Sequence, residues 1–226
     1  MPNDELKFVR ISLMDPCPCR GGRSFGACHG AVDGPLPETP PPPEFVSIFS
    51  KRQGTTPEWL KHLIEAAIRF IFTPADSGVN LGQPRGESCA TVAMQTLLLL
   101  KHYGVAARVI AGAARWKGYP FSYRWGGQDE YHMWVETEFS EIVDLTCDDL
   151  SSRAGILHAW SHIPAPRNCW ESPSALSDRG YVEIEGGHAQ INVDVPGEPA
   201  FDRLAELALN FCRSHEDEFR RRYPEI

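Results

Sequence analysis

Apolar residues recur at helical spacing in three stretches of the chain. The first begins at Thr56-Pro57-Glu58, with Thr56 predicted as a hydroxyl N-cap, and ends before Pro74. The second runs over residues 89–102 and stops at Gly104, a natural left-handed terminator. It is apolar almost all round, which predicts burial on several sides. The third, residues 199–222, has one apolar face and predicts an amphipathic helix.

Other stretches have the composition or the alternation of β-strands. A turn over residues 138–140 would pair Tyr131–Thr137 with Glu141–Leu145 in antiparallel fashion. In the predicted register His132 faces position 147, and Asp144 lies within diagonal reach on the same face. Residues 151–178 are predicted to be irregular. The predicted strands are residues 105–116, 131–137, 141–145, and a hairpin of 181–185 with 189–195 about Gly186-Gly187.

Composition shifts divide the chain into three parts. Residues 1–32 contain a compact Cys/Gly block, residues 33–43 are a stiff proline-rich linker, and residues 44–226 form the main domain. Since helices and antiparallel strands share that main domain, the expected fold class is α+β.

Charge and cysteine content limit the function. The formal net charge of −8 argues against a general nucleic-acid or anionic-membrane surface. No basic and apolar leader is evident at the N-terminus, and no apolar run is long enough for a bilayer, so a cytoplasmic location is expected. In a reducing compartment, seven cysteines suggest metal binding or catalysis before disulfides.

Four potential zinc ligands lie in the Cys/Gly block: Cys17, Cys19, Cys28 and His29. Thiolates and imidazole in a tetrahedral set suit Zn²⁺, whose binding would supply folding free energy to a block without a core. The stretch CPCRGGRSFGACHG resembles the SEC-C motif, although Arg20 and Phe25 depart from the usual residues. That resemblance implies a structural zinc module, often a protein-interaction appendage. The alternative to a zinc module is a flexible tail whose cysteines bind no metal.

Cys89, in PRGESCATVA, lies where the second helix begins. A helix N-terminus stabilises a thiolate, so Cys89 is a candidate nucleophile, although a cysteine at the head of an apolar helix can also be simple packing. A nucleophile needs a base and a group that orients the base. His132 is the candidate base and Asp144 the candidate orienting group. Of the other cysteines, Cys147 is expected to be buried near the site.

The order of Cys89, His132 and Asp144 resembles the transglutaminase-like branch of the papain-like fold. The similar segments are GESCATVAMQTLLLLKHYGVAARVIAGAARW and YHMWVETEFSEIVDLT, with Leu145 in place of the family's proline. The resemblance implies a nucleophile helix packed on an antiparallel sheet, and thiol chemistry on an acyl group. Gln83 lies six residues before Cys89, the spacing of the oxyanion-hole glutamine in papain-like proteases.

The expected function is therefore a cysteine-dependent hydrolase or acyl transferase acting on a peptide, protein or amide substrate, with no cofactor in the chemistry. The alternative is a non-catalytic adaptor, in which the zinc module recruits a protein partner and the main domain is an inactive scaffold. A metallohydrolase is a third option, but the main domain has no HxxEH or HxH cluster.

Overall fold

The structure is a computed structural model that describes residues 52–79, 85, 88–119, 122–123, 131–152, 164–184 and 199–225. The predicted zinc module and proline-rich linker lie outside the described residues. So do Gln83 and the second strand of the predicted hairpin, residues 189–195.

The three long predicted helices are confirmed. Helix α3 starts at Cys89 and is followed by Gly104 at a φ of 76°, the left-handed conformation expected there. Helix α1 buries its predicted apolar face, from Leu60 to Ile71, against the rest of the domain. Pro74 does not simply end a helix, because it opens the short helix α2. The helices are α1 Glu58–Ile71, α2 Pro74–Ser77, α3 Cys89–His102 and α4 Pro199–Arg222, with 3₁₀ turns η2 Cys147–Ser152 and η3 Pro173–Ala175.

The prediction that Thr56 caps α1 is wrong. Pro57 holds the N-cap position, and no side chain caps the helix. The Thr56 hydroxyl instead donates a 2.6 Å hydrogen bond to Glu141 Oε2, and its backbone N–H donates to Oε1 of the same carboxylate. The Thr56 hydroxyl therefore bonds to a buried carboxylate far away in the sequence, and not to the backbone N–H groups at the start of α1.

Within the described ranges, the strands form one antiparallel sheet, and the strands differ in length. Its order is β2-β1-β3-β4-β5, and β6 pairs with the second half of β1. Strand β5 was missed, because it lies inside the stretch 151–178 that was predicted to be irregular. The strands are β1 Ala107–Trp116, β2 Ser122–Tyr123, β3 His132–Thr137, β4 Ile142–Asp144, β5 Cys169–Glu171 and β6 Arg179–Glu183.

The β3–β4 register differs by one residue from the predicted register. Val135 faces Val143 and Glu136 faces Ile142, so the observed pairing, continued along the strands, sets His132 opposite position 146 rather than 147. Side chains alternate between faces, so a slip of one residue would move Asp144 to the other face from His132. The prediction that the two side chains share a face is confirmed, and only the observed register is consistent with it.

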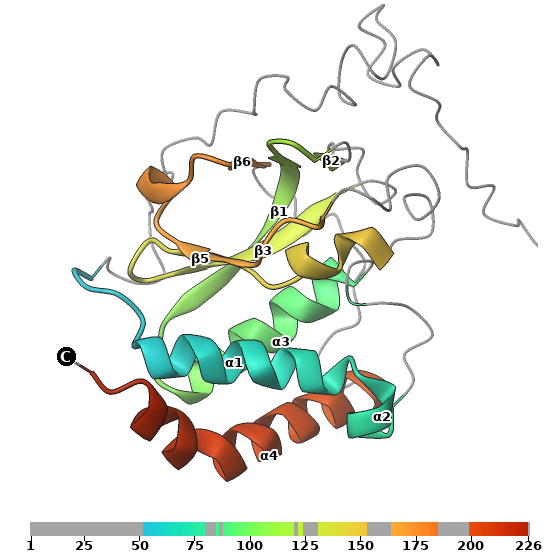
Figure 1. Ribbon diagram of the computed structural model, residues 1–226, viewed down its shortest axis with the longest axis vertical. Helices are drawn as coiled ribbons and strands as arrows, with labels where there is room; N and C mark the ends of the chain where they lie inside the picture. The colour runs from blue at the N-terminus through green and yellow to red at the C-terminus, as the bar shows by residue number, and fades with distance from the viewer. Residues whose placement is uncertain are drawn as a thin grey trace, which may run out of the picture.

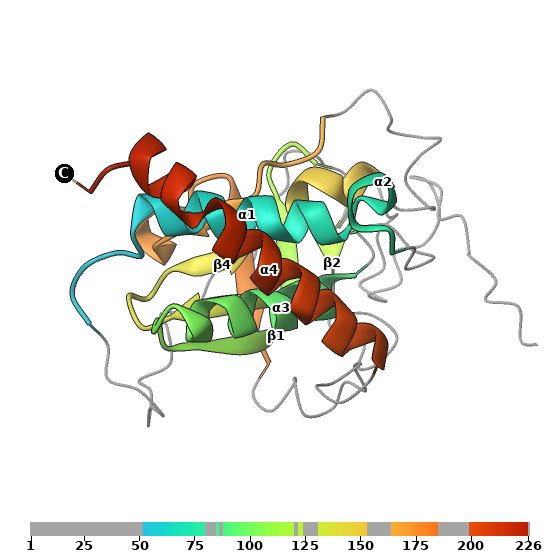
Figure 2. The same ribbon diagram turned by 90° about the horizontal axis from the view of Figure 1, so that it is seen from below.

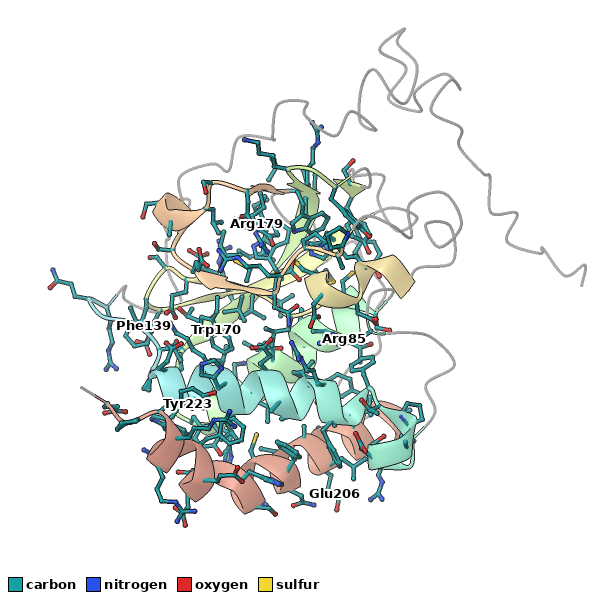
Figure 3. All side chains as sticks on the ribbon, viewed as in Figure 1. Arg85, Phe139, Trp170, Arg179, Glu206 and Tyr223 are labelled. Carbon is teal, nitrogen blue, oxygen red and sulfur yellow. The ribbon has the colours of Figure 1, made fainter. Side chains whose placement is uncertain are left out.

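The sheet separates two hydrophobic cores. Figures 1 and 2 show α1, α3 and α4 together on one side of the sheet, where they cover residues such as Ala111, Met133 and Val135. The other face carries the rings of Trp116, Trp134 and Tyr181. Figure 3 shows Tyr223 beside α1, where its ring stacks on His62 with centroids 4.0 Å apart, and Arg179 in the strand layer away from these helices.

The helices of the described part can be compared with the length and hydropathy that a membrane-spanning helix needs. None of them is both long and apolar enough to cross a bilayer.

Candidate functional site

Cys89 is the first residue of α3, and its side chain is 6% exposed. The first turn of this 14-residue helix contains no acidic residue. The free backbone N–H groups and the positive end of the helix dipole therefore face the region of Cys89 without an acidic group of that turn to offset them. This position favours an anionic group bound close to the start of α3.

His132 is the first residue of β3, and its side chain is fully buried. Aromatic rings surround the imidazole. The Tyr123 ring stacks on it with centroids 4.6 Å apart, and Trp116 meets it edge-on at 5.5 Å. Trp134 and Tyr181 lie slightly farther away, at 6.1 and 6.3 Å. This packing restricts the ring to one orientation.

In this orientation the imidazole of His132 contacts the carboxylate of Asp144. His132 Nε2 and Asp144 Oδ2 lie 2.7 Å apart, and both side chains are removed from solvent. A charge-assisted hydrogen bond of this length in a dry environment fixes the ring and its tautomer. The structure thus brings the predicted base and its predicted orienting group into direct contact.

The Asp144 carboxylate accepts several further hydrogen bonds. Oδ2 also accepts from the Tyr181 hydroxyl at 2.8 Å and from the Cys147 thiol at 3.0 Å. Oδ1 accepts from the backbone N–H and the hydroxyl of Thr146, at 3.2 and 2.7 Å. Every donor is buried, so the carboxylate keeps its charge and its position without water.

These contacts set the protonation of the pair. Burial alone would lower the pKa of His132, but the Asp144 carboxylate, with a smaller contribution from the Cys89 thiol, raises it to about 9. Burial alone would raise the pKa of Asp144, but the His132 ring and the Cys147 and Thr146 donors hold it well below its usual range. At neutral pH the pair is therefore an imidazolium and a carboxylate.

The second ring nitrogen of His132, Nδ1, is the one that does not contact Asp144. Nδ1 is buried and makes no hydrogen bond to any residue that the structure describes. The Cys89 thiol nevertheless interacts with the same ring, since it contributes to the raised pKa. The thiol is therefore close to the imidazole, although no hydrogen bond between the two has ordinary geometry.

The sequence assigns no role to three residues of this cluster: Tyr181, Thr146 and Cys147. Only Cys147 was expected near the site, because it follows Asp144 by three positions. Its thiol is fully buried, and burial together with Asp144 raises its pKa well above the usual value. Tyr181 comes from β6, and no local signal in the sequence connects it with Asp144.

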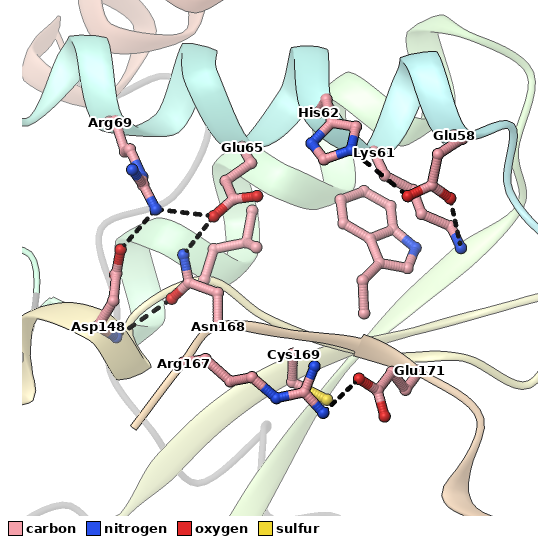
Figure 4. A pocket seen from close by; sticks show the side chains of 12 residues that line it. Glu58, Lys61, His62, Glu65, Arg69, Asp148, Arg167, Asn168, Cys169 and Glu171 are labelled. Atoms are coloured by element: carbon pink, nitrogen blue, oxygen red, sulfur yellow. Dashed lines mark hydrogen bonds and ion pairs between the residues drawn. The ribbon is translucent and has the colours of Figure 1, made fainter. Parts of the chain in front are cut away.

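A separate groove of about 330 Å³ lies between α1 and β5 (Figure 4). Its charged groups are paired with one another: Arg69 contacts Glu65 and Asp148, and Lys61 contacts Glu58. None of Cys89, His132 and Asp144 lines it. Among the described residues, no group of three or more His, Cys, Asp or Glu is placed to hold a metal ion. The predicted zinc ligands lie outside that part of the chain.

Comparison with known proteins gives little to add to this geometry. No family model matches the sequence, and no curated protein is similar to it. Among solved structures, the crystal structure of the genomics target APC5867 is similar, with 16% identity over 73% of this chain and 82% of that chain and a TM-score of 0.47. A similarity of this degree assigns neither a family nor an activity.

Proposed function

We propose that this chain is a cysteine-dependent hydrolase or acyl transferase, with Cys89 as nucleophile, His132 as acid and base, and Asp144 as the orienting group. One observation carries the proposal: a fully buried His132 is bonded to Asp144 at 2.7 Å while the Cys89 thiol acts on the same ring. Helix α3 packed on an antiparallel sheet supports a papain-like core, the arrangement that the sequence resemblance implies.

The chemistry follows from the charges. The buried imidazolium favours a thiolate on Cys89, and this sulfur attacks the carbonyl carbon of an amide. The C–S bond forms, and the carbonyl electrons move to oxygen. When they return, the C–N bond breaks and the leaving amine takes the proton from His132. Water or a second amine then attacks the thioester and gives a proton to His132, and the thiolate leaves.

The oxyanion requires donors near the start of α3. The backbone N–H of Cys89 belongs to the free N–H groups of the first helical turn, which suits this role. Gln83 remains the predicted side-chain donor, outside the described residues. The substrate class is a peptide, protein or amide, because an acyl carbon bearing a nitrogen leaving group uses both the thiolate and the proton on His132.

The zinc module is a second part of the proposal. Cys17, Cys19, Cys28 and His29 would hold one Zn²⁺ and provide a surface for a protein partner, apart from the chemistry at Cys89. Metal analysis of the full chain tests this: one zinc per chain is expected, and its loss in Cys17→Ser with unchanged Cys89 reactivity. A full chain without zinc would contradict it.

Alkylation of Cys89 by iodoacetamide tests the catalytic pair. At pH 6 we expect Cys89 to be labelled at least about tenfold faster in the wild type than in His132→Gln, because the imidazolium supports the thiolate. Peptide mass spectrometry follows Cys89 and, as an internal control, the buried thiol of Cys212. Equal Cys89 rates in the two proteins would show that Cys89 is packing.

A p-nitrophenyl ester then tests the covalent step. A burst of nitrophenol, close to one equivalent per chain, is expected from formation of the thioester. The burst is lost in Cys89→Ala. A protein that passes the alkylation test but gives no burst with a panel of activated esters would favour an inactive scaffold, as in the adaptor hypothesis.

A further inference from the structure

Three donors converge on one oxygen atom of the candidate site. Asp144 Oδ2 accepts from His132 Nε2, from the Tyr181 hydroxyl and from the Cys147 thiol, at 2.7, 2.8 and 3.0 Å. The carboxylate needs only one of these bonds to orient the imidazole. The other two draw negative charge away from the oxygen that faces the ring.

The sheet explains why Tyr181 reaches this oxygen. Gly112 of β1 faces His132 of β3, and Ala114 of β1 faces Tyr181 of β6. Directly opposed residues share a face, and residues two apart share it too, so His132 and Tyr181 project from the same side of the sheet. The absence of a side chain at Gly112 lets β6 lie close to β1, since a Cβ there would lie 1.9 Å from the Val182 carbonyl oxygen and 3.1 Å from the Trp134 ring.

We propose that the Tyr181 hydroxyl is a positioning group of this site, which acts through Asp144 and sets how firmly His132 holds its proton. The inference rests on the proposed function, because a firmly held proton matters only if His132 must give it to a leaving group. A carboxylate at 2.7 Å without other donors on the same oxygen would stabilise the imidazolium more and so oppose that transfer. A hydroxyl on the same oxygen weakens this hold while it keeps the carboxylate ionised.

The hydroxyl is suited to this role across the working pH range. Tyr181 is 1% exposed, and burial together with Asp144 raises its pKa well above the usual value, so it stays a neutral donor. The titratable or charged groups around His132 and its carboxylate come from six elements: Cys89 of α3, Asp144 of β4, Cys147 of η2, Cys169 of β5, Tyr123 of β2, and Tyr181 and Arg179 of β6.

A packing role and a positioning role of Tyr181 predict shifts of the His132 midpoint in opposite directions. If Tyr181 only packed, its loss would loosen the pair, and the imidazolium would become easier to deprotonate. If it draws charge from Oδ2, its loss leaves more negative charge facing the ring, and the imidazolium becomes harder to deprotonate. The two roles therefore move the titration of His132 in opposite directions.

The experiment follows the His132 titration by NMR of the full chain carrying ¹³Cε1-labelled histidine, with the signal assigned by its loss in His132→Gln. Tyr181→Phe is expected to raise the midpoint by about 0.5 to 1 pH unit. Tyr119→Phe is the matched control, because its buried hydroxyl has no hydrogen-bond partner in the described part of the chain. An unchanged or lowered midpoint in Tyr181→Phe would overturn the inference.

Asp144→Asn provides the second arm. Without the carboxylate, Tyr181→Phe should add no further shift, and a shift of the same size there would also overturn the inference. Cys147→Ala removes another donor from the same oxygen and should give the same sign of shift, which serves if Tyr181→Phe does not fold. Cys89 alkylation in the same proteins reports separately: if it ignores His132, the proposed function fails while the titration still decides the role of Tyr181.

Discussion

Two buried carboxylates flank the short strand β4: Glu141 lies directly before it and Asp144 is its last residue, and they are 3% and 2% exposed. Glu141 accepts from Thr56, from the Thr137 hydroxyl and from the Trp170 ring, and it pairs with Lys61 at 3.3 Å. Its partners come from the segment before α1, from α1 itself, from β3 and from β5. This carboxylate therefore joins separate parts of the fold.

The donors at Asp144 are of another kind. His132 is an imidazole, the side chain best suited to proton transfer, while the raised pKa values of Tyr181 and Cys147 keep them protonated donors, and all three meet one oxygen. Two carboxylates with nearly the same burial, three residues apart, thus differ in what their partners can do. Both are buried and accept several hydrogen bonds, four at Glu141 and five at Asp144. The imidazole partner of Asp144 is therefore what makes its end of β4 a candidate for proton transfer.

Removal of Glu141 should have the largest effect on stability and none on the thiol. Glu141→Ala leaves the Thr56, Thr137 and Trp170 donors and the Lys61 charge without their acceptor, and we expect a loss of about 4 kcal/mol in urea unfolding. Glu171→Ala is the control, since its half-buried carboxylate pairs with an exposed arginine and should cost less than about 1 kcal/mol. Slower Cys89 labelling in native Glu141→Ala would contradict the division of roles.

Removal of the charge at Asp144 should cost about 3 kcal/mol, with a marked pH dependence. The pKa of His132 is raised to about 9 in the folded protein, above its unfolded value of about 6.5. This contribution is complete below pH 6.5 and is lost as the pH rises through 9. The pKa of Asp144 is lowered, so its contribution is present above about pH 3.9 and is lost as the pH falls.

The cost of Asp144→Asn should therefore be greatest between about pH 4 and 6.5 and should shrink on both sides. Urea unfolding of wild type and variant at a series of pH values measures it. A cost that does not vary with pH would mean that the His132–Asp144 pair is not ionised, and the charge state of the candidate site would have to be revised.

Gly112→Ala should disturb the Asp144 end of β4 alone. A Cβ at Gly112 would lie 1.9 Å from the Val182 carbonyl oxygen, so β6 must move off β1 and carry Tyr181 away from Asp144. We expect a loss of about 2 to 3 kcal/mol and a shifted His132 titration. Gly118→Ala is the control, because a Cβ there meets nothing within 4 Å and only the positive φ costs energy. An equal loss in both variants would contradict the close approach.

The sequence predicts the local features of this molecule well. Helices α1, α3 and α4 follow from apolar periodicity, and the start of α3 at Cys89 follows from the break in that periodicity before it. Strand β5 was missed because its three residues lie just after Pro164 and Pro166, in a stretch without alternation. Short edge strands depend on their neighbours more than on their own residues.

Long-range partners explain the remaining misses. Thr56 has the residue type and the position of an N-cap, but Glu141 is distant in sequence and therefore invisible to a local rule. The roles of Tyr181 and Thr146 depend on which oxygen of Asp144 they reach, and that depends on a register the sequence predicted only to within one residue. Pairing of His132 with Asp144 was predictable, whereas the donors that adjust it were not.

Substitutions of the two threonines beside these carboxylates give the most selective test. Thr146 and Thr137 are equally buried, and each donates its hydroxyl to the carboxylate at its own end of β4, at 2.7 and 3.0 Å. Thr146→Val should cost about 1.5 to 2 kcal/mol, because valine keeps the shape and removes a bond to a charged group. Thr137→Val should cost more, because the Thr137 hydroxyl also accepts from the backbone N–H groups of Phe139 and Glu141, both at 3.3 Å. Urea unfolding should therefore show the larger loss of stability for Thr137→Val.

The His132 titration should distinguish them. Thr146→Val removes a donor from Asp144 Oδ1 and should raise the His132 midpoint by about 0.3 pH unit, less than Tyr181→Phe because Oδ1 is not the oxygen bonded to the ring. Thr137→Val should leave the midpoint unchanged, because Glu141 does not contact the imidazole. A shift in Thr137→Val would show that both ends of β4 act on His132, and the separation of the structural carboxylate from the proton-transfer carboxylate would fail.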